Sequence, residues 1–329
     1  MSARTTTRIG RRLAATAASL VVLSACGGGG DDGAARETAS PFPVRITAIR
    51  EGAIAFTRDL GSGPRVYVLN RDASGGTPLF APGRSQGNPA WGPGGKTMAF
   101  DIGCGSNIAA AYVVDPYGKK RVERAIPKGV DGCAPTWSPD GRMIAFEGLH
   151  DGQQDIWVSR SDGSAGHRLT DDGAVDAHPS WSRDGQRIAF TSDRGAGSDI
   201  YVMDADGSNV QVLYAGPFAD LDPTWSPDGR SVVFSSASAE GCAVEDGDCA
   251  HHLWVVKADG SGAEQVTSGS GHDLDPVWSP DGSRIAFVSD RDGDFDIYVV
   301  DVDGGKIEQV TNDPGTDRML SWGDRPAGV

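Results

Sequence analysis

Apolar residues and turn-forming residues alternate along this chain in a pattern that returns about every 44 residues. One phrase carries the pattern: residues 134–146 read APTWSPDGRMIAF, and residues 178–190, 222–234 and 275–287 repeat it closely. Its Trp recurs at Trp91, Trp137, Trp181, Trp225, Trp278 and Trp322, and a Phe and a later aromatic residue each recur six times as well. Three markers with the same count indicate six repeated units.

Each unit has the residue pattern of four short β-strands separated by turns. Segments such as IAF and DIYV are β-branched or aromatic; a P-x-W segment precedes them and a segment such as EQVT follows. In the SPDG turns, Pro fixes the first central φ, Asp suits the second central position, and Gly suits the position after it. No ten-residue stretch has the period and the caps of a helix. We therefore predict an all-β chain.

Four short antiparallel strands cannot bury both faces of their sheet alone, but sheets stacked around an axis cover one another. Six units therefore predict a six-bladed β-propeller of four-stranded antiparallel blades, with the repeated Trp and Phe packed between blades. The first unit lacks a Trp phrase, and the last Trp phrase, LSWGD at 320–324, has no unit after it. We expect this C-terminal segment to close the ring as the inner strand of the first blade. The alternative inner strand is VRITAI at 44–49.

Residues 1–25 have the pattern of an export signal rather than of a folded domain. Several Arg precede an uncharged, mostly apolar stretch at 13–25, which is too short to span a bilayer. Its end, Leu23-Ser24-Ala25-Cys26, resembles a bacterial lipobox, which implies cleavage before Cys26 and lipidation of that residue. An ordinary cleavage site beside an unrelated Cys is the alternative. Residues 26–43 are then the lipidated Cys and a flexible Gly-rich tether, and residues 44–329 are the propeller.

Charge and cysteines narrow the possible functions. The formal net charge of −15 repels nucleic acid, so we exclude nucleic-acid binding. In an exported chain, cysteines favour disulfides, and we expect the pairs Cys104–Cys133 and Cys242–Cys249, with free buried thiols as the alternative. Both pairs fall on the face with the longer and more variable loops, where binding residues tend to lie.

Acidic residues gather where the inner strands begin, and inner strands line the central channel of a propeller. We expect two rings near the channel mouth: first Asp176, Asp220, Asp273 and Asp317, then His178, Asp222 and Asp275. Such side chains can bind a basic segment of a partner or a metal ion, for which His178, Asp222 and Asp275 are the candidate ligands. The alternative for the first ring is that each Asp caps its loop by accepting backbone N–H bonds.

The repeated phrase, WSPDG followed by IAF and DIYV, resembles the repeat of TolB-like propellers. The resemblance covers roughly residues 44–324, and the nearest full copies are 181–211 and 278–311. It implies a periplasmic propeller that binds a peptidoglycan-associated lipoprotein. We expect the chain to depart from TolB itself in two ways: it leaves no room for the N-terminal α/β domain, and it has a lipobox-like segment of its own. Two families of enzymes have similar repeats. Prolyl-oligopeptidase-like peptidases need a Gly-x-Ser-x-Gly elbow, which this sequence lacks. Oligogalacturonate lyases bind a metal ion with His ligands at the propeller mouth, so an enzymatic function stays an alternative.

Together these features favour a non-catalytic protein of the bacterial cell envelope. We expect a lipid-anchored monomer, facing the periplasm or the cell exterior, that binds an envelope protein or a cell-wall glycan through its variable-loop face. No cofactor is expected apart from Ca²⁺ or another divalent cation at the channel mouth. The alternative is a metal-assisted polysaccharide lyase or hydrolase acting at that mouth, and a third possibility is a structural scaffold of the envelope.

Overall fold

The computed structural model describes residues 53–69, 76–79, 85–104, 109–114, 123–195, 197–239 and 249–324. The export signal, Cys26, the tether, the alternative strand at 44–49 and Cys242 lie outside these residues. Within the described ranges the chain forms β-strands and one short 3₁₀ helix, Pro93–Gly95. The all-β prediction is therefore confirmed. In the same ranges, no helix is long and apolar enough to cross a membrane.

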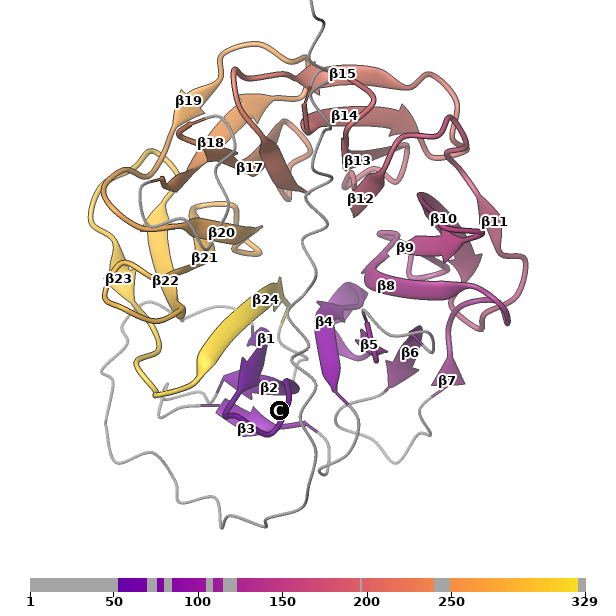
Figure 1. Cartoon of the computed structure of the whole chain (residues 1–329), viewed down its shortest axis with the longest axis horizontal. Coiled ribbons are helices and arrows are strands. Elements are labelled where there is room, and N and C mark those ends of the chain that lie inside the picture. Colours follow the sequence, from indigo (N-terminus) through magenta and orange to yellow (C-terminus); the bar gives the residue numbers. More distant parts are fainter. Residues whose placement is uncertain are drawn as a thin grey trace, which may run out of the picture.

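Six four-stranded antiparallel sheets stand around a central axis as the blades of a propeller (Figure 1). Blade 1 joins the end of the chain to its start: β24 (Thr316–Gly323), β1 (Ala53–Asp59), β2 (Arg65–Leu69) and β3 (Gly76–Pro78). Blade 2 contains β4 (Gln86–Trp91), β5 (Met98–Ile102), β6 (Ala110–Val114) and β7 (Glu123–Arg124). Blade 3 contains β8 (Asp131–Trp137), β9 (Met143–His150), β10 (Gln153–Arg160) and β11 (His167–Arg168).

The other three blades follow the same order from the axis outward. Blade 4 contains β12 (Asp176–Trp181), β13 (Arg187–Ser192), β14 (Asp199–Asp204) and β15 (Gln211–Tyr214). Blade 5 contains β16 (Asp220–Trp225), β17 (Ser231–Ala237), β18 (His251–Lys257) and β19 (Glu264–Gln265). Blade 6 contains β20 (Asp273–Trp278), β21 (Arg284–Ser289), β22 (Asp296–Asp301) and β23 (Glu308–Gln309). The predicted six-bladed architecture is confirmed.

Ring closure follows the C-terminal prediction. Strand β24 pairs antiparallel with β1, so that Ala53 lies opposite Gly323 and Ile54 lies opposite Trp322. This pairing places the last strand of the chain in the same sheet as the first (Figure 1). Because β24 is the inner strand of blade 1, the inner edge of β1 is paired.

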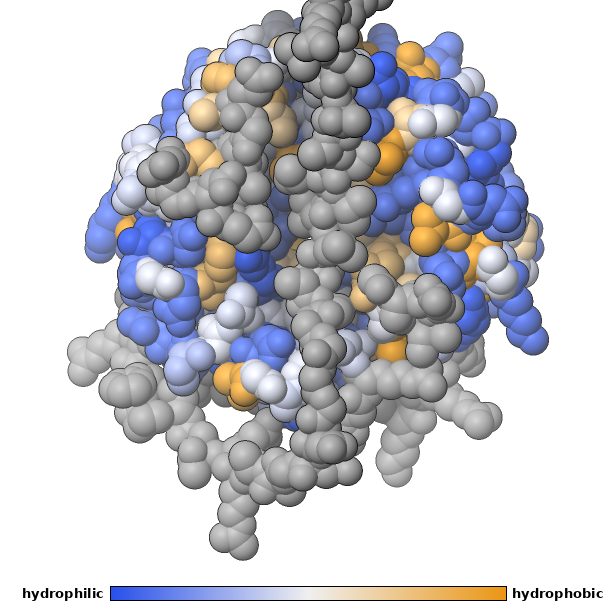
Figure 2. Space-filling view, in the orientation of Figure 1, coloured by the Kyte–Doolittle hydropathy of each residue, from blue (hydrophilic) through white to orange (hydrophobic). Residues whose placement is uncertain are grey.

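The repeated Phe forms the core between blades. Phe56, Phe100, Phe146, Phe190, Phe234 and Phe287 are each at most 1% exposed. Each packs against a neighbouring blade, as Phe234 of blade 5 does against Val202 and Leu213 of blade 4. Complete burial of one such side chain contributes about 1.5–3 kcal/mol, so these contacts hold the blades together. The face of the molecule in Figure 2 is mostly hydrophilic, with hydrophobic residues scattered over it.

Two of the repeated Trp residues link their inner strand to the one before it. The indole N–H of Trp137 in blade 3 donates to the carbonyl of Ala90 in blade 2, at 3.1 Å. In blade 6 the indole of Trp278 donates to the carbonyl of Thr224 in blade 5, at 3.0 Å. These bonds satisfy a polar group that would otherwise be costly to bury, and they confirm the predicted packing role of the Trp.

A β-bulge near the start of each inner strand positions the candidate site. The pairing register shifts at this place in all six blades. One residue in each bulge has a φ between 45° and 57°: Asn88, Ala134, His178, Asp222, Asp275 and Met319. A bulged residue does not take part in the regular ladder, so the bulge re-aims both its side chain and its N–H.

Candidate functional site

A central channel of about 450 Å³ lies between the inner strands of the six blades. The six bulged residues line it, and we call them the inner ring. The next alternate positions also line it with small side chains: Ala90, Thr136, Ser180, Thr224, Val277 and Ser321. Small side chains leave the channel open. The structure thus brings the predicted residues His178, Asp222 and Asp275 together on one channel wall.

Carboxylates of the channel mouth accept N–H groups from the next blade. Asp275 Oδ2 accepts the N–H of Met319 at 2.9 Å, and Asp222 accepts the N–H of Asp275. Glu147 Oε1 accepts the N–H of His178 at 2.8 Å. The bulge exposes these N–H groups, and the carboxylates satisfy them, so each contact also joins two blades.

Two acidic residues of this site, Asp101 and Glu147, were not predicted. Each directly follows the Phe of its repeat, where the other units carry Thr, Ser or Val. Asp101 Oδ2 accepts the side-chain amide of Asn88 at 2.6 Å and the N–H of Ala134 at 3.1 Å. A charged residue at this position of the repeat could have identified both residues from the sequence. The strand pattern by itself predicts only a buried residue of the sheet there.

His178 lies between carboxylates of blades 3 and 5. Its Nδ1 is 3.1 Å from Asp222 Oδ1, close enough for an ion pair but without the alignment of a hydrogen bond. Its Nε2 is 3.5 Å from Glu147 Oε1. Burial acts to lower the pKa of His178, but the charges of Asp222, Glu147 and Asp275 outweigh it and raise this pKa above its usual value. The imidazole is therefore drawn toward its charged form.

Two carboxylates at or near the mouth, Asp101 and Asp222, hold protons more tightly than usual. Burial raises the pKa of Asp101 to about 6, against the hydrogen bonds from Asn88 and Ala134. Burial also raises the pKa of Asp222 to about 6, although His178 opposes the rise. Closely spaced carboxylates with raised pKa values gain from an incoming cation, whether that cation is a metal ion or a Lys or Arg side chain.

The three candidate metal ligands are near one another without forming a compact donor set. The ligand atoms of His178, Asp222 and Asp275 do not all lie within 4.8 Å of each other. Among the described residues, two clusters have all their possible ligand atoms within 4.8 Å of one another. One consists of Asp101, Cys104 and Cys133, and the other of Asp292, Asp294 and Asp296. The two cysteines of the first group are disulfide-bonded.

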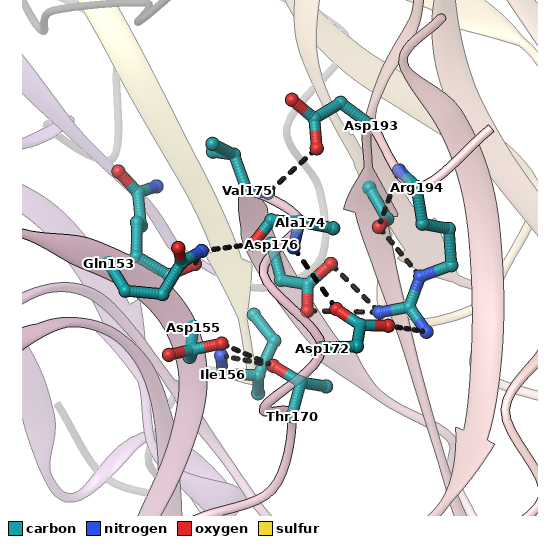
Figure 3. A network of polar contacts seen from close by, with 12 residues as sticks. Gln153, Asp155, Ile156, Thr170, Asp172, Ala174, Val175, Asp176, Asp193 and Arg194 are labelled. Atoms are coloured by element: carbon teal, nitrogen blue, oxygen red, sulfur yellow. Dashed lines mark hydrogen bonds and ion pairs between the residues drawn. The ribbon is translucent and has the colours of Figure 1, made fainter. Parts of the chain in front are cut away.

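The residues predicted as the first ring, which we call the outer ring, lie inside the blades. Asp176, Asp220, Asp273 and Asp317 are at most 2% exposed, and none of them lines the channel. Arg194 binds both oxygens of Asp176 through Nη2, at 2.9 and 3.0 Å (Figure 3). Buried ion pairs of this kind keep the Asp away from ligands, so the outer ring differs from the expectation that it faces the mouth.

Arg residues neutralise three of the four outer-ring carboxylates. They pair as Arg194 with Asp176, Arg291 with Asp273 and Arg58 with Asp317, at 2.9, 2.5 and 2.6 Å. Each guanidinium also stacks on the Phe of its own repeat, as Arg194 does at 5.2 Å from the Phe190 ring. The fourth carboxylate, Asp220, instead accepts the N–H of Gly216 at 2.8 Å, which is the loop-capping role considered from the sequence.

One predicted disulfide is present. Cys104 follows β5 of blade 2, Cys133 lies in β8 of blade 3, and the two are bonded. The bond joins neighbouring blades beside the bulged residue Ala134 of the channel mouth. Cys249 is also disulfide-bonded, and its predicted partner Cys242 lies outside the described residues.

Comparison with known protein families identifies the repeat. The family described as TolB beta propeller domain matches residues 88–250 and 220–323. The Tol-Pal system protein TolB of Anaeromyxobacter dehalogenans is 38% identical over 139 residues, which are 41% of this chain and 29% of that protein. An uncharacterized protein of Agrobacterium fabrum is 34% identical over 110 residues, 32% of this chain and 35% of its own length. The matched segments thus span about a third of these relatives.

Solved structures show how widely the fold is used. TolB from Acinetobacter baumannii superposes with a TM-score of 0.71 at 22% identity, covering 83% of this chain and 67% of that one. Hydrazine synthase from Kuenenia stuttgartiensis superposes with a TM-score of 0.66 at 14% identity, covering 83% of this chain and 46% of that one. Since proteins of such different kinds share the propeller, these likenesses establish the fold alone, and function must be argued from the site.

Proposed function

Because the chain belongs to the TolB beta propeller domain family, we propose that it is a non-catalytic, lipid-anchored protein of the bacterial cell envelope. In this proposal it binds a basic segment of a partner protein at its channel mouth. The relatives named Tol-Pal system proteins support an envelope location and a protein partner. The lipobox-like end at Leu23–Cys26 supports the anchor.

The acidic channel mouth is the observation that carries the proposal. Glu147, Asp222 and Asp275 surround His178, and Asp222, Asp275 and His178 line the open channel. A fourth carboxylate, the buried Asp101, accepts hydrogen bonds from the inner-ring residues Asn88 and Ala134. Among the described residues, none of these four carboxylates has an Arg or Lys partner, in contrast with the outer ring. A partner's Lys or Arg can extend its apolar stem along the small side chains of the wall while its charge meets the carboxylates.

Charge removal at the mouth tests this binding. Asp222→Asn with Asp275→Asn keeps an oxygen for each inter-blade N–H bond and removes two negative charges. We expect the double variant to fold and to bind a fluorescent Lys-rich peptide at least about tenfold more weakly, with a smaller dependence on salt. When the parent and the double variant are each purified from cross-linked cell envelopes, we expect the parent to retain a bound partner protein and the double variant to lose it.

A matched control removes two charges from the opposite face. Asp184→Asn with Asp228→Asn changes turn residues of SPDG-type segments, where each Asp bonds a nearby Ser and backbone N–H. We expect this control to bind the peptide like the parent. Equal weakening by both double variants would show an unspecific effect of net charge and would contradict a binding site at the mouth.

The lipid anchor is tested separately with Cys26→Ala. We expect this variant to remain folded and to leave the membrane fraction, because stable retention of such a chain needs covalent acyl chains. If it partitions into detergent like the parent, the anchor proposal is wrong. In the described residues no observation favours the lyase or hydrolase alternative over binding.

A further inference from the structure

Polar residues between neighbouring blades follow one arrangement that is repeated around much of the propeller. Between blades 3 and 4, the Thr170 hydroxyl lies 3.5 Å from Asp155 Oδ1 and is also hydrogen-bonded to Asp176. Arg194 pairs with Asp176 from the other side (Figure 3). Two buried carboxylates thus share a hydroxyl and have a guanidinium beside them.

The same two partners recur at two further junctions. They are Thr267 and Arg291 at Asp273 between blades 5 and 6, and Thr311 and Arg58 at Asp317 between blades 6 and 1. A carboxylate that has lost its water needs such compensation, because an isolated buried charge costs several kcal/mol. The repeat therefore compensates three of the four buried outer-ring Asp residues in the same way.

The junction between blades 4 and 5 keeps the carboxylates and lacks both partners. Asp199 and Asp220 occupy the positions of Asp155 and Asp176 in their repeats. Tyr214 stands in place of the Thr, and Ser238, four residues after Phe234, stands in place of the Arg. Among the described residues, neither carboxylate has an Arg, Lys or His partner. The sequence that follows, 239–248, contains no Lys or Arg either.

Asp220 is fully buried and only partly satisfied. Its Oδ2 accepts the N–H of Gly216 at 2.8 Å, and the Ser236 hydroxyl also bonds the carboxylate. Its Oδ1 has no hydrogen-bond partner. Burial raises the pKa of Asp220 to about 6, and the charge of Asp199, itself 8% exposed, adds to the rise. At neutral pH this pair of carboxylates lacks a compensating positive charge.

The position of Tyr214 limits the kind of cation that can neutralise Asp199 and Asp220. At the sister junctions the guanidinium stacks on the repeated Phe, as Arg291 does at 5.5 Å from the Phe287 ring. At the junction of blades 4 and 5, the ring of Tyr214 from blade 4 lies 4.8 Å from the ring of Phe234 in blade 5 and takes this stacking surface. The Phe ring of this junction is therefore already covered, which favours a small ion over a stacked guanidinium.

We propose that Asp199 and Asp220 bind a Ca²⁺ ion between blades 4 and 5, in the role that an Arg has at the sister junctions. Both side chains supply hard carboxylate oxygens, and Ca²⁺ accepts carboxylates together with carbonyl and water oxygens in a flexible geometry. No described Cys or His contacts either carboxylate, which disfavours zinc. The ion fixes blade 5 against blade 4 and is separate from the channel mouth.

Calcium addition to the full-length chain tests this site. After EDTA treatment and dialysis at pH 7.5, we expect millimolar CaCl₂ to raise the melting temperature by about 5 °C, because the ion binds only the folded state. Equilibrium dialysis with CaCl₂ should show one bound ion that Asp220→Asn loses. MgCl₂ should stabilise less, since Mg²⁺ requires nearly ideal octahedral geometry.

Two control variants separate this site from its neighbours. Tyr214→Thr with Ser238→Arg rebuilds the sister junction; it should melt higher than the parent in EDTA and lose the response to Ca²⁺. Asp222→Asn with Asp275→Asn alters only the channel mouth and should keep the response. Asp199→Asn, at a less buried carboxylate, serves as a second loss-of-binding variant if Asp220→Asn does not fold.

Two results overturn the proposal. One is an equal Ca²⁺ content and an equal melting shift in the parent, in Asp199→Asn and in Asp220→Asn. The other is a parent protein whose melting temperature does not change with Ca²⁺ and rises as the pH falls from about 6 to about 4. In that case a proton, and not a metal ion, would neutralise Asp220.

Discussion

The outer ring and the inner ring lie two residues apart along the inner strands, and they use acidic residues in opposite ways. In the outer ring, Asp176, Asp273 and Asp317 are buried and each is paired with an Arg of its own blade. In the inner ring, the side chains of Asp222 and His178 are 16% and 30% exposed and line the channel.

The difference shows that the surroundings, and not the residue type, decide the role of an Asp in this repeat. Where a guanidinium reaches the carboxylate, the pair is part of the packing between blades. Where only backbone N–H groups and one imidazole reach it, the negative charge remains available to a ligand. Asp220 is intermediate, because it is as buried as its sisters but lacks their Arg.

Deletion of residues 316–329 removes one member of each ring and has the largest expected effect. The deletion takes β24 out of blade 1 and leaves β1 with an unpaired inner edge. We expect loss of cooperative unfolding and a tendency to aggregate, measured by circular dichroism during heating and by size-exclusion chromatography. A truncated chain that melts within a few degrees of the parent would contradict the closure by β24.

Asp317→Ala compares the stability contribution of the outer ring with that of the inner ring. It leaves Arg58 buried with only Asp313 as a carboxylate partner, so the free energy of unfolding should fall by about 3–5 kcal/mol. Asp222→Ala removes one acceptor at the partly exposed channel wall and should cost about 1 kcal/mol. Urea unfolding at pH 7 measures both, and equal losses would contradict the proposed division between the rings.

The pH dependence of stability should have opposite signs at Asp101 and Asp273. Burial raises the folded pKa of Asp101 to about 6, so its contribution is complete below about pH 4 and is lost as the pH rises to about 6. At Asp273 burial is outweighed by His252, Thr267 and Arg291, which lower the pKa. Its contribution is therefore complete above about pH 4 and is lost as the pH falls further.

Single variants separate these two contributions, which are the smallest of the expected effects. Asp101→Asn should reduce the decline in stability between pH 4 and pH 6, and Asp273→Asn should reduce the decline below pH 4. Urea midpoints measured from pH 3 to pH 7 provide the comparison. The same change of slope in both variants would show that net charge, rather than the two local environments, controls the pH dependence.

Much of the fold could be predicted because the repeat encodes it locally. The spacing of Trp, Phe and the strand aromatic specifies the number of blades, and the SPDG turns place the strand ends. In the structure Gly141 of such a turn has a φ of 70°, a conformation that glycine adopts without strain. The unpaired Trp phrase at the C-terminus also specified the closing strand, since a ring of repeats must supply the missing member of its first blade.

The sequence by itself therefore determined the propeller, its closure and the position of His178, Asp222 and Asp275 at the inner strands. Tertiary structure alone decided which acidic residues face the channel. Residues two apart share one side of a regular strand, but the bulge at His178 breaks this rule, so Asp176 is buried while His178 lines the channel. The partners of these residues come from other strands: Arg194 reaches Asp176 from 18 residues away, and Glu147 reaches His178 from the neighbouring blade. Local sequence periodicity does not encode such contacts, because they depend on how the blades are rotated against one another.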